Sequence, residues 1–164
     1  MTKMNQEIIK ARQRLSGILI KNDFSLAIAE SCTGGLLAKV LTDQAGSSEW
    51  FECGIVSYSN AAKHAFLAID EGLIARDGAV SASVAEAMVD GLLALSAADI
   101  AVSTTGIAGP GGGSVEKPVG LVWFAVKNGT NQSYSIKHVF SGDRDEIRQQ
   151  AVLVALELLL VELN

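Results

Sequence analysis

Apolar residues recur at helical spacing in several segments of the chain. Helices are predicted over about Asn5–Lys21, Thr33–Leu41, Ala61–Leu67, Ser81–Ala97 and Arg144–Leu163. The spacing identifies them because side chains three and four positions apart share one face of a helix. In the fourth of these segments Ser83 precedes Glu86 by three residues, which predicts a capping box at the start of the helix.

Short apolar or alternating runs lie between these helices. Strands are predicted over Phe24–Ala29, Cys53–Tyr58, Asp99–Thr105, Val119–Lys127 and Tyr134–Phe140. The turn signal Asn128-Gly129 precedes the last run and predicts that it is antiparallel to its predecessor. Strands that alternate with helices indicate a single α/β domain over residues 1–164, with a mixed, mainly parallel sheet and helices packed on its faces.

The last predicted helix is apolar over most of its circumference. Such a helix is either enclosed in the core or covered by a second subunit. The sequence leaves both alternatives open, and the second of them predicts a homodimer.

The composition restricts the class of protein. The chain has 164 residues, 49% of them hydrophobic, with 13 Lys and Arg against 18 Asp and Glu. The apolar content excludes a disordered chain, and the formal charge of -5 argues against binding to a nucleic acid backbone. The most apolar segment, Ala151–Leu163, is shorter than the ~20 residues that span a bilayer, so no membrane anchor is expected.

Cysteine usage and the N-terminal segment bear on location. The two cysteines, Cys32 and Cys53, are too few for a disulfide framework and have no metal-ligand spacing with His64 or His138. The polar N-terminal segment lacks the pattern of a secretion signal. The sequence therefore predicts a soluble cytoplasmic protein without a metal site.

Polar or glycine-rich segments follow three of the predicted strands. They are Glu30–Gly35, Tyr58–Lys63 and Gly106–Gly113. In open α/β sheets, ligands bind outside the carboxyl ends of the strands. We therefore expect candidate site residues in these three segments.

Ser31 has two interpretations at the turn from strand to helix. It is a suitable helix cap, and it is also suitably placed for a nucleophile beside backbone N–H groups that favour an anion. Gly34 and Gly35 would each cost the helix about 1 kcal/mol, which indicates that something approaches the backbone closely there.

A nucleophilic serine needs a base, and the sequence offers Lys63 more readily than a histidine. His138 lies on an alternating strand and His64 in a short helix, without an evident acidic partner. A lysine base must be neutral, and moving its pKa from ~10.4 to ~7 takes about 4 to 5 kcal/mol of burial or nearby charge. The alternative interpretation is that Lys63 is an ordinary solvated residue of a helix. Cys32 is a competing nucleophile with His64 as its base, or else a small buried residue.

The glycine-rich run matches neither the Walker loop nor the dinucleotide fingerprint. It lacks Gly-Lys-Ser/Thr, and no helix pattern opens after it. It is either a nest of N–H donors for an anion or a flexible connection. Arg144 could clamp a phosphate with its planar guanidinium, or be an ordinary exposed residue at the start of a helix.

Six blocks in a fixed order carry a resemblance that covers nearly the whole chain. They are AESCTGG (29–35), YSNAAK (58–63), GAVS (78–81), TGIAGP (105–110), EKPVG (116–120) and GDR (142–144). The chain resembles the nicotinamide-nucleotide amidase family, a domain also found at the C-terminus of CinA proteins. Larger members carry an additional N-terminal domain for which this chain has no room, so it is similar to the stand-alone form.

The resemblance implies hydrolysis of nicotinamide mononucleotide to nicotinate mononucleotide and ammonia, with no metal or organic cofactor. It implies Ser31 as nucleophile, Lys63 as general base and Tyr58 beside them. Positions implied around the substrate are Cys32, Thr33, Gly34, Gly35, Thr105, Gly106, Gly109, Gly111 and Arg144. The alternative from another class is a non-catalytic nucleotide-binding module that dimerises through its last helix.

Overall fold

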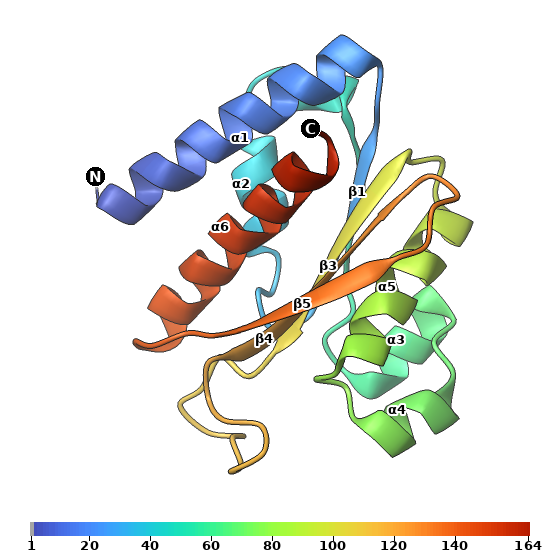
Figure 1. The fold of residues 1–164 in the computed structure, drawn as a ribbon, viewed down its shortest axis with the longest axis vertical. Helices are drawn as coiled ribbons and strands as arrows, with labels where there is room; N and C mark the ends of the chain where they lie inside the picture. Colours follow the sequence, from blue (N-terminus) through green and yellow to red (C-terminus); the bar gives the residue numbers. More distant parts are fainter. Residues whose placement is uncertain (1) are drawn as a thin grey trace.

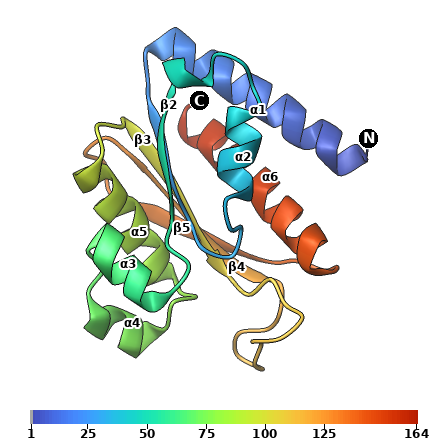
Figure 2. The same ribbon diagram turned by 180° about the vertical axis from the view of Figure 1, so that it is seen from behind.

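The computed structural model describes residues 2–164 and arranges them in one α/β domain (Figures 1 and 2). In chain order the elements are α1 (Lys3–Asn22), β1 (Leu26–Glu30), α2 (Leu36–Thr42), the 3₁₀ turn η1 (Ser47–Glu49), β2 (Phe51–Val56), α3 (Asn60–Leu67), α4 (Glu71–Asp77), α5 (Ala82–Leu95), β3 (Ile100–Gly106), β4 (Leu121–Asn128), β5 (Tyr134–Val139) and α6 (Arg144–Glu162).

The strands form one mixed sheet in the order β2-β1-β3-β4-β5. β1 is parallel to both β2 and β3, whereas β4 is antiparallel to β3 and to β5. Four of the five strands described therefore point the same way, and the predicted fold class is confirmed. The register pairs Glu30 with Val56 and with Thr104, so β1, β2 and β3 end at one edge of the sheet.

Two helical layers cover the sheet, and each has its own core. α1, α2 and α6 lie on one face, and α3, α4 and α5 lie on the other (Figures 1 and 2). β1 is buried on both faces, because Leu26 and Ile28 face the first layer while Ala27 and Ala29 face the second. This double burial explains why β1 reads as a continuous apolar run rather than an alternating one.

The final helix lies inside the molecule. α6 contacts β3 and β4, and α1 packs against its other side (Figure 1). Its buried residues are Ile147, Ala151, Val152, Ala155, Leu156, Leu158, Leu159 and Leu160. Of the two alternatives that the sequence left open, the core accounts for the apolar circumference of α6. The homodimer stays a prediction, now without this helix as its reason.

Two details of the helix ends differ from the sequence analysis. Ser81, not Ser83, caps α5, since its Oγ accepts a hydrogen bond from the N–H of Val84 at 3.3 Å. The Ser83 hydroxyl instead donates to Asp77 at 2.6 Å, so the predicted capping box with Glu86 is wrong. The two residues have the required spacing, but α5 begins at Ala82, two residues too early for Ser83 to be its N-cap.

α4 is not predicted by the sequence analysis, and the capping box lies at the start of α6. There the Asp143 carboxylate accepts the N–H of Glu146, and the Glu146 carboxylate accepts the N–H of Asp143. The pair fixes the position at which α6 begins and therefore the position of Arg144.

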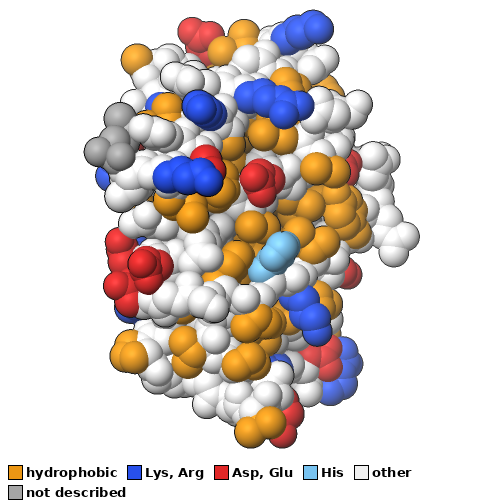
Figure 3. All heavy atoms as spheres, turned by 60° about the vertical axis from the view of Figure 1, so that its left-hand side comes forward, with side chains coloured by type: hydrophobic (Ala, Val, Ile, Leu, Met, Phe, Trp, Pro, Cys, Tyr) orange, Lys and Arg blue, Asp and Glu red, His pale blue; other side chains and the backbone are white. Residues whose placement is uncertain are grey.

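The surface has no single charge character on the face that Figure 3 shows. Basic, acidic and hydrophobic side chains are interspersed there. Within residues 2–164, no helix combines the length and apolarity needed to cross a membrane. The absence of nucleic acid partners stays a prediction.

Candidate active site

Ser31 lies in an irregular turn between β1 and α2, not at a helix cap. We call residues 31–35 the Ser31 turn. α2 begins at Leu36, three residues later than predicted, and Gly35 is its N-cap residue. Gly34 and Gly35 have φ angles of 59° and 92°, in the left-handed region that glycine adopts without a Cβ clash. The glycine pair thus shapes the turn rather than weakening a helix.

Glu30 takes the place of the missing cap. Its carboxylate accepts hydrogen bonds from the backbone N–H groups of Gly35 at 3.0 Å, Leu37 at 3.1 Å and Ala38 at 2.9 Å. The side chain is 1% exposed, so the first N–H groups of α2 satisfy a buried carboxylate. Glu30 is not among the predicted site residues, although a charged residue at the end of a buried strand is a usable signal.

Two further groups anchor the Ser31 turn. The N–H of Ser31 donates to the carbonyl of Thr104 at 2.9 Å, and the hydroxyls of Thr33 and Thr104 are 2.8 Å apart. From α6, Arg148 donates to the carbonyl of Thr33 through Nη2 at 2.7 Å and Nε at 3.2 Å. The turn is therefore held by β1, β3 and α6 together.

Lys63 reaches Ser31 from the opposite face of the sheet. Ser59 caps α3 by accepting the N–H of Ala62, and Lys63 follows in the first turn of this helix. Lys63 Nζ donates to Ser31 Oγ at 2.9 Å, to the Ser57 carbonyl at 2.7 Å and to the Tyr58 carbonyl at 3.5 Å. The predicted serine and lysine therefore lie together.

Burial makes this lysine unusual. Lys63 is 1% exposed, and none of the ion pairs found among residues 2–164 includes it. Desolvation lowers the pKa of its amine to about 8, from an ordinary value of 10.5. The neutral amine is thus a minor form near physiological pH, but it is far more populated than in an ordinary lysine, and this is the form that a general base requires.

The competing thiol has neither the charge state nor the base it would need. Burial raises the pKa of Cys32 to about 12. Nδ1 of the exposed His64 is 2.9 Å from the Ile69 carbonyl, so this ring is engaged away from the thiol. His138 stacks on Phe140 on the far strands of the sheet. Neither histidine lines the pocket of Ser31.

Ser31 and Lys63 open into a pocket of about 280 Å³. Its lining is Ser31, Cys32, Tyr58, Lys63, Ala79, Val80, Thr105, Gly106, Ile107, Ala108, Gly109, Gly111, Gly112 and Arg144. The lining contains two basic residues and no carboxylate, although the whole chain is acidic. The guanidinium of Arg144 therefore suits the pocket to an anionic group, whatever the charge on Lys63.

Three of the expected substrate-contacting residues lie outside this lining. Thr33 is 0% exposed and bonded to Thr104, while Gly34 and Gly35 lie behind Ser31 against Arg148 and Glu30. These residues support the turn from behind. Conversely, the lining includes residues that the sequence analysis did not list: Ala79, Val80, Ile107, Ala108 and Gly112.

Arg144 closes one side of the pocket. Its Nη1 donates to the Gly109 carbonyl at 2.7 Å and its Nη2 to the Tyr58 hydroxyl at 2.9 Å. The Tyr58 phenol therefore contacts Arg144, and only the Tyr58 carbonyl approaches Lys63. Tyr58 is 57% exposed, which leaves its ring available at the mouth of the pocket.

Thr105 and Gly106 shape the floor between β3 and the neighbouring loop. The Thr105 hydroxyl donates to the Ala79 carbonyl at 2.8 Å and holds the wall formed by Ala79 and Val80. A Cβ at Gly106 would lie 2.6 Å from the carbonyl oxygen of Leu121, so only glycine lets β4 approach there.

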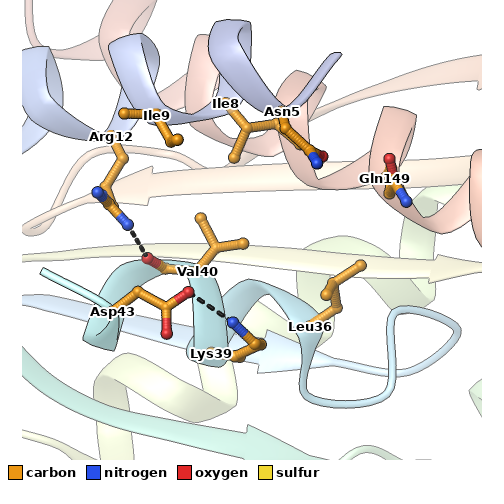
Figure 4. A pocket seen from close by; sticks show the side chains of 9 residues that line it. All are labelled: Asn5, Ile8, Ile9, Arg12, Leu36, Lys39, Val40, Asp43 and Gln149. Atoms are coloured by element: carbon orange, nitrogen blue, oxygen red, sulfur yellow. Dashed lines mark hydrogen bonds and ion pairs between the residues drawn. The ribbon is translucent and has the colours of Figure 1, made fainter. Parts of the chain in front are cut away.

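A second pocket of about 280 Å³ lies between α1, α2 and α6 (Figure 4). Lys39 pairs with Asp43 at 2.6 Å, and Arg12 donates to the Val40 carbonyl at 3.1 Å. The rest of its lining is Asn5, Ile8, Ile9, Leu36 and Gln149, so it holds no nucleophile with a base. Across residues 2–164, no three His, Cys, Asp or Glu side chains gather as metal ligands.

The fold and the first pocket define a class of protein. It is an α/β domain whose ligand pocket lies at the carboxyl ends of parallel strands, with a serine hydroxyl held against a buried lysine.

Comparison with known proteins identifies the family. The family model described as CinA C-terminal domain matches residues 8–163. The chain is 46% identical over 155 residues to nicotinamide-nucleotide amidohydrolase PncC of Escherichia coli (strain K12), covering 94% of each protein. It is 52% identical over 134 residues to the protein of the same name from Enterobacter agglomerans, covering 82% of each. The chain belongs to the CinA C-terminal domain family.

A solved structure agrees with this assignment. The competence/damage inducible protein CihA from Agrobacterium tumefaciens superposes with a TM-score of 0.92 at 42% identity, over 96% of each chain. The resemblance drawn from the six sequence blocks is confirmed.

Proposed function

We propose that this chain is an amidohydrolase that converts nicotinamide mononucleotide to nicotinate mononucleotide and ammonia. The observation that carries the proposal is the 2.9 Å contact between Ser31 Oγ and the amine of the buried Lys63. The names of the two relatives, both nicotinamide-nucleotide amidohydrolases, support the substrate class.

The contacts of Lys63 suit a neutral amine. Its two N–H groups donate to the carbonyls of Ser57 and Tyr58, and its lone pair then faces Ser31 Oγ. In that state the serine hydroxyl donates to the amine, which is the arrangement a general base needs before it takes the proton.

The reaction then proceeds in two halves. Ser31 Oγ attacks the carboxamide carbon while its proton moves to Lys63, and the C–N bond breaks as Lys63 gives that proton to the departing ammonia. Water next attacks the acyl-serine, passes a proton to Lys63 and restores the Ser31 hydroxyl as the acid leaves. Neither half requires a metal or an organic cofactor.

An oxyanion forms in both halves and needs donors. The backbone N–H of Cys32 directly follows the nucleophile and donates to no backbone carbonyl within the part of the chain described. We assign it to the oxyanion, where the loss of one donor costs about 3 kcal/mol in known cases.

The remaining pocket suits a pyridine mononucleotide. We assign the phosphate to Arg144 and to the N–H groups of the glycine-rich loop, because both line the pocket. The exposed aromatic ring of Tyr58 is suited to stack on the cationic pyridinium of the substrate. A neutral Lys63 does not repel this pyridinium. The electron-withdrawing pyridinium in turn makes its carboxamide easier to attack.

An ammonia-release assay on a panel of pyridine nucleotides tests the proposal. Ser31→Ala is expected to abolish turnover while changing the free energy of unfolding by about 1 kcal/mol, the scale of one hydrogen bond. Ser48→Ala, at an exposed serine of η1, is the matched control and is expected to keep full activity.

Two results would contradict the mechanism or the activity. A folded Ser31→Ala variant with substantial turnover would remove Ser31 as nucleophile. Calorimetric binding of the mononucleotide to the wild type without ammonia release, across a range of pH, would instead favour the non-catalytic binding module.

A further inference from the structure

Arg148 contacts the Ser31 turn but not the pocket. It lies one helical turn after Arg144 on α6, so both guanidinium groups extend from the same side of that helix. Arg144 lines the pocket, whereas Arg148 does not and donates two hydrogen bonds to the Thr33 carbonyl behind it.

We propose that Arg148 is a positioning residue for the serine chemistry. By fixing the Thr33 carbonyl, it holds the Ser31 turn so that Ser31 Oγ stays on Lys63 and the N–H of Cys32 stays directed at the substrate. The inference rests on the proposed function and assigns a role to a residue that does not touch the substrate.

The hydrogen bonds of the turn show why this contact matters. Glu30 anchors the residues after the turn, and Thr104 anchors Ser31 and the Thr33 side chain. Within the turn itself, the Thr33 carbonyl accepts only the Leu36 N–H at 3.1 Å. The guanidinium of Arg148 occupies the other lone-pair direction and ties the peptide plane after Thr33 to α6.

Gly34 is suited to this approach. A Cβ at Gly34 would lie 3.4 Å from Nη2 of Arg148, so this glycine and the guanidinium lie against each other. Its φ of 59° lies in the left-handed region, which side chains other than glycine rarely adopt. Gly34 therefore lets the turn adopt this backbone conformation directly beside the Arg148 guanidinium.

The positive charge of Arg148 supports the serine chemistry as its hydrogen bonds do. Its positive field is among the influences that oppose the burial-driven rise in the pKa of Cys32, the residue next to the nucleophile. The same field favours negative charge on Ser31 Oγ and on the oxyanion as they develop, since the site is shielded from water.

The test compares Arg148→Met, which keeps the aliphatic stem, with Arg148→Lys, which keeps a charge and a single donor group. Gln149→Ala is the matched control, because Gln149 is the next residue on α6 and points into the second pocket (Figure 4). Each variant is assayed for kcat and KM in ammonia release from nicotinamide mononucleotide.

A second readout does not depend on the substrate. A fluorophosphonate reacts with an activated serine as Oγ attacks phosphorus, the P–F bond breaks, fluoride leaves and the proton passes to Lys63. The rate at which Ser31 gains this label is followed by intact-protein mass spectrometry, with thermal unfolding to verify that each variant is folded.

For Arg148→Met we expect kcat and the labelling rate to fall together by about 10- to 100-fold, the scale of a 1 Å misplacement, with KM within about twofold. Arg148→Lys should lie between it and the wild type, and it decides the matter if the Met variant does not fold. Gln149→Ala should match the wild type.

The outcomes separate the inference from the function. A folded Arg148 variant labelled at the wild-type rate, or one that changes KM alone, overturns the positioning role while leaving the amidohydrolase intact. A wild-type protein that neither takes the label nor releases ammonia overturns the proposed function, and the positioning role with it.

Discussion

At the scale of single residues, the site depends on Lys63, whose charged amine is disfavoured by burial in the folded protein. The change in the pKa of Lys63 from 10.5 to about 8 corresponds to roughly 3 kcal/mol against the charged amine, at about 1.4 kcal/mol per unit. That is a sizeable share of the 5–15 kcal/mol by which domains are typically stable, and the proposed role of Lys63 as general base accounts for this cost.

This cost predicts a dependence of stability on pH that belongs to Lys63 alone. Between about pH 8 and 10.5 the unfolded chain binds the Lys63 proton while the folded chain has released it, so the folding stability rises with pH across this window. Relative to Lys63→Met, the wild type should gain up to roughly 3 kcal/mol there. Urea unfolding of both proteins at several pH values measures the difference, because other titrating groups cancel.

A constant difference between the two proteins across this window would show that Lys63 keeps its ordinary pKa in the folded state. Lys127→Met provides the control. Lys127 is paired with Asp90 at 2.8 Å at the surface. The free energies of unfolding of the wild type and Lys127→Met should therefore differ by a constant amount across this pH range.

The sequence predicted which residues meet but not what lowers the pKa of Lys63. The ends of strands and the starts of helices brought Ser31 and Lys63 to one edge of the sheet. Burial of Lys63 depends on the carbonyls of Ser57 and Tyr58 and on packing across the sheet, which no local pattern around a lysine in a short polar helix reveals.

At the scale of elements, the difference between prediction and structure lies in how α2 begins. The apolar pattern located α2, but the glycines placed its first residue at Leu36, because their left-handed angles cannot belong to a helix. A serine beside a helix pattern indicates a cap. The buried carboxylate of Glu30 supplies this function instead, through hydrogen bonds formed across the turn.

Glu30→Gln should therefore loosen the link between β1 and α2. One carboxylate oxygen accepts the N–H groups of both Gly35 and Leu37, and the other accepts that of Ala38. An amide can supply only one oxygen, so at least one buried N–H loses its partner, at a cost of about 1–3 kcal/mol in the free energy of unfolding. A lower urea midpoint together with a lower kcat is expected.

Glu49→Gln is the matched control, since the Glu49 side chain is exposed and, unlike that of Glu30, is not among the groups that bond the first N–H groups of α2. It should leave the urea midpoint and kcat unchanged. If Glu30→Gln behaved in the same way, the carboxylate would not be the group that anchors the Ser31 turn.

At the scale of the whole molecule, the site joins the two helical layers. Cys32 of the Ser31 turn belongs to the core under α1, α2 and α6, whereas Leu67 of the helix that carries Lys63 belongs to the core under α3, α4 and α5 (Figures 1 and 2). The contact between Ser31 and Lys63 exists only when both layers are docked on the sheet.

Damage to either core should therefore remove activity and structure together. Leu156→Ala in the first layer and Met88→Ala in the second each truncate a fully buried side chain, which costs about 2–5 kcal/mol. Val161→Ala, at a side chain that is 70% exposed, is the control and should cost far less. Ammonia release and far-UV circular dichroism, followed across the same urea series, should give coincident transitions for every variant.

Because β1 is buried from both faces and pairs with strands that contact both layers, neither layer has a separate sheet on which to persist. Loss of activity in Met88→Ala at urea concentrations where the dichroism is still native would show instead that the layer carrying Lys63 undocks alone.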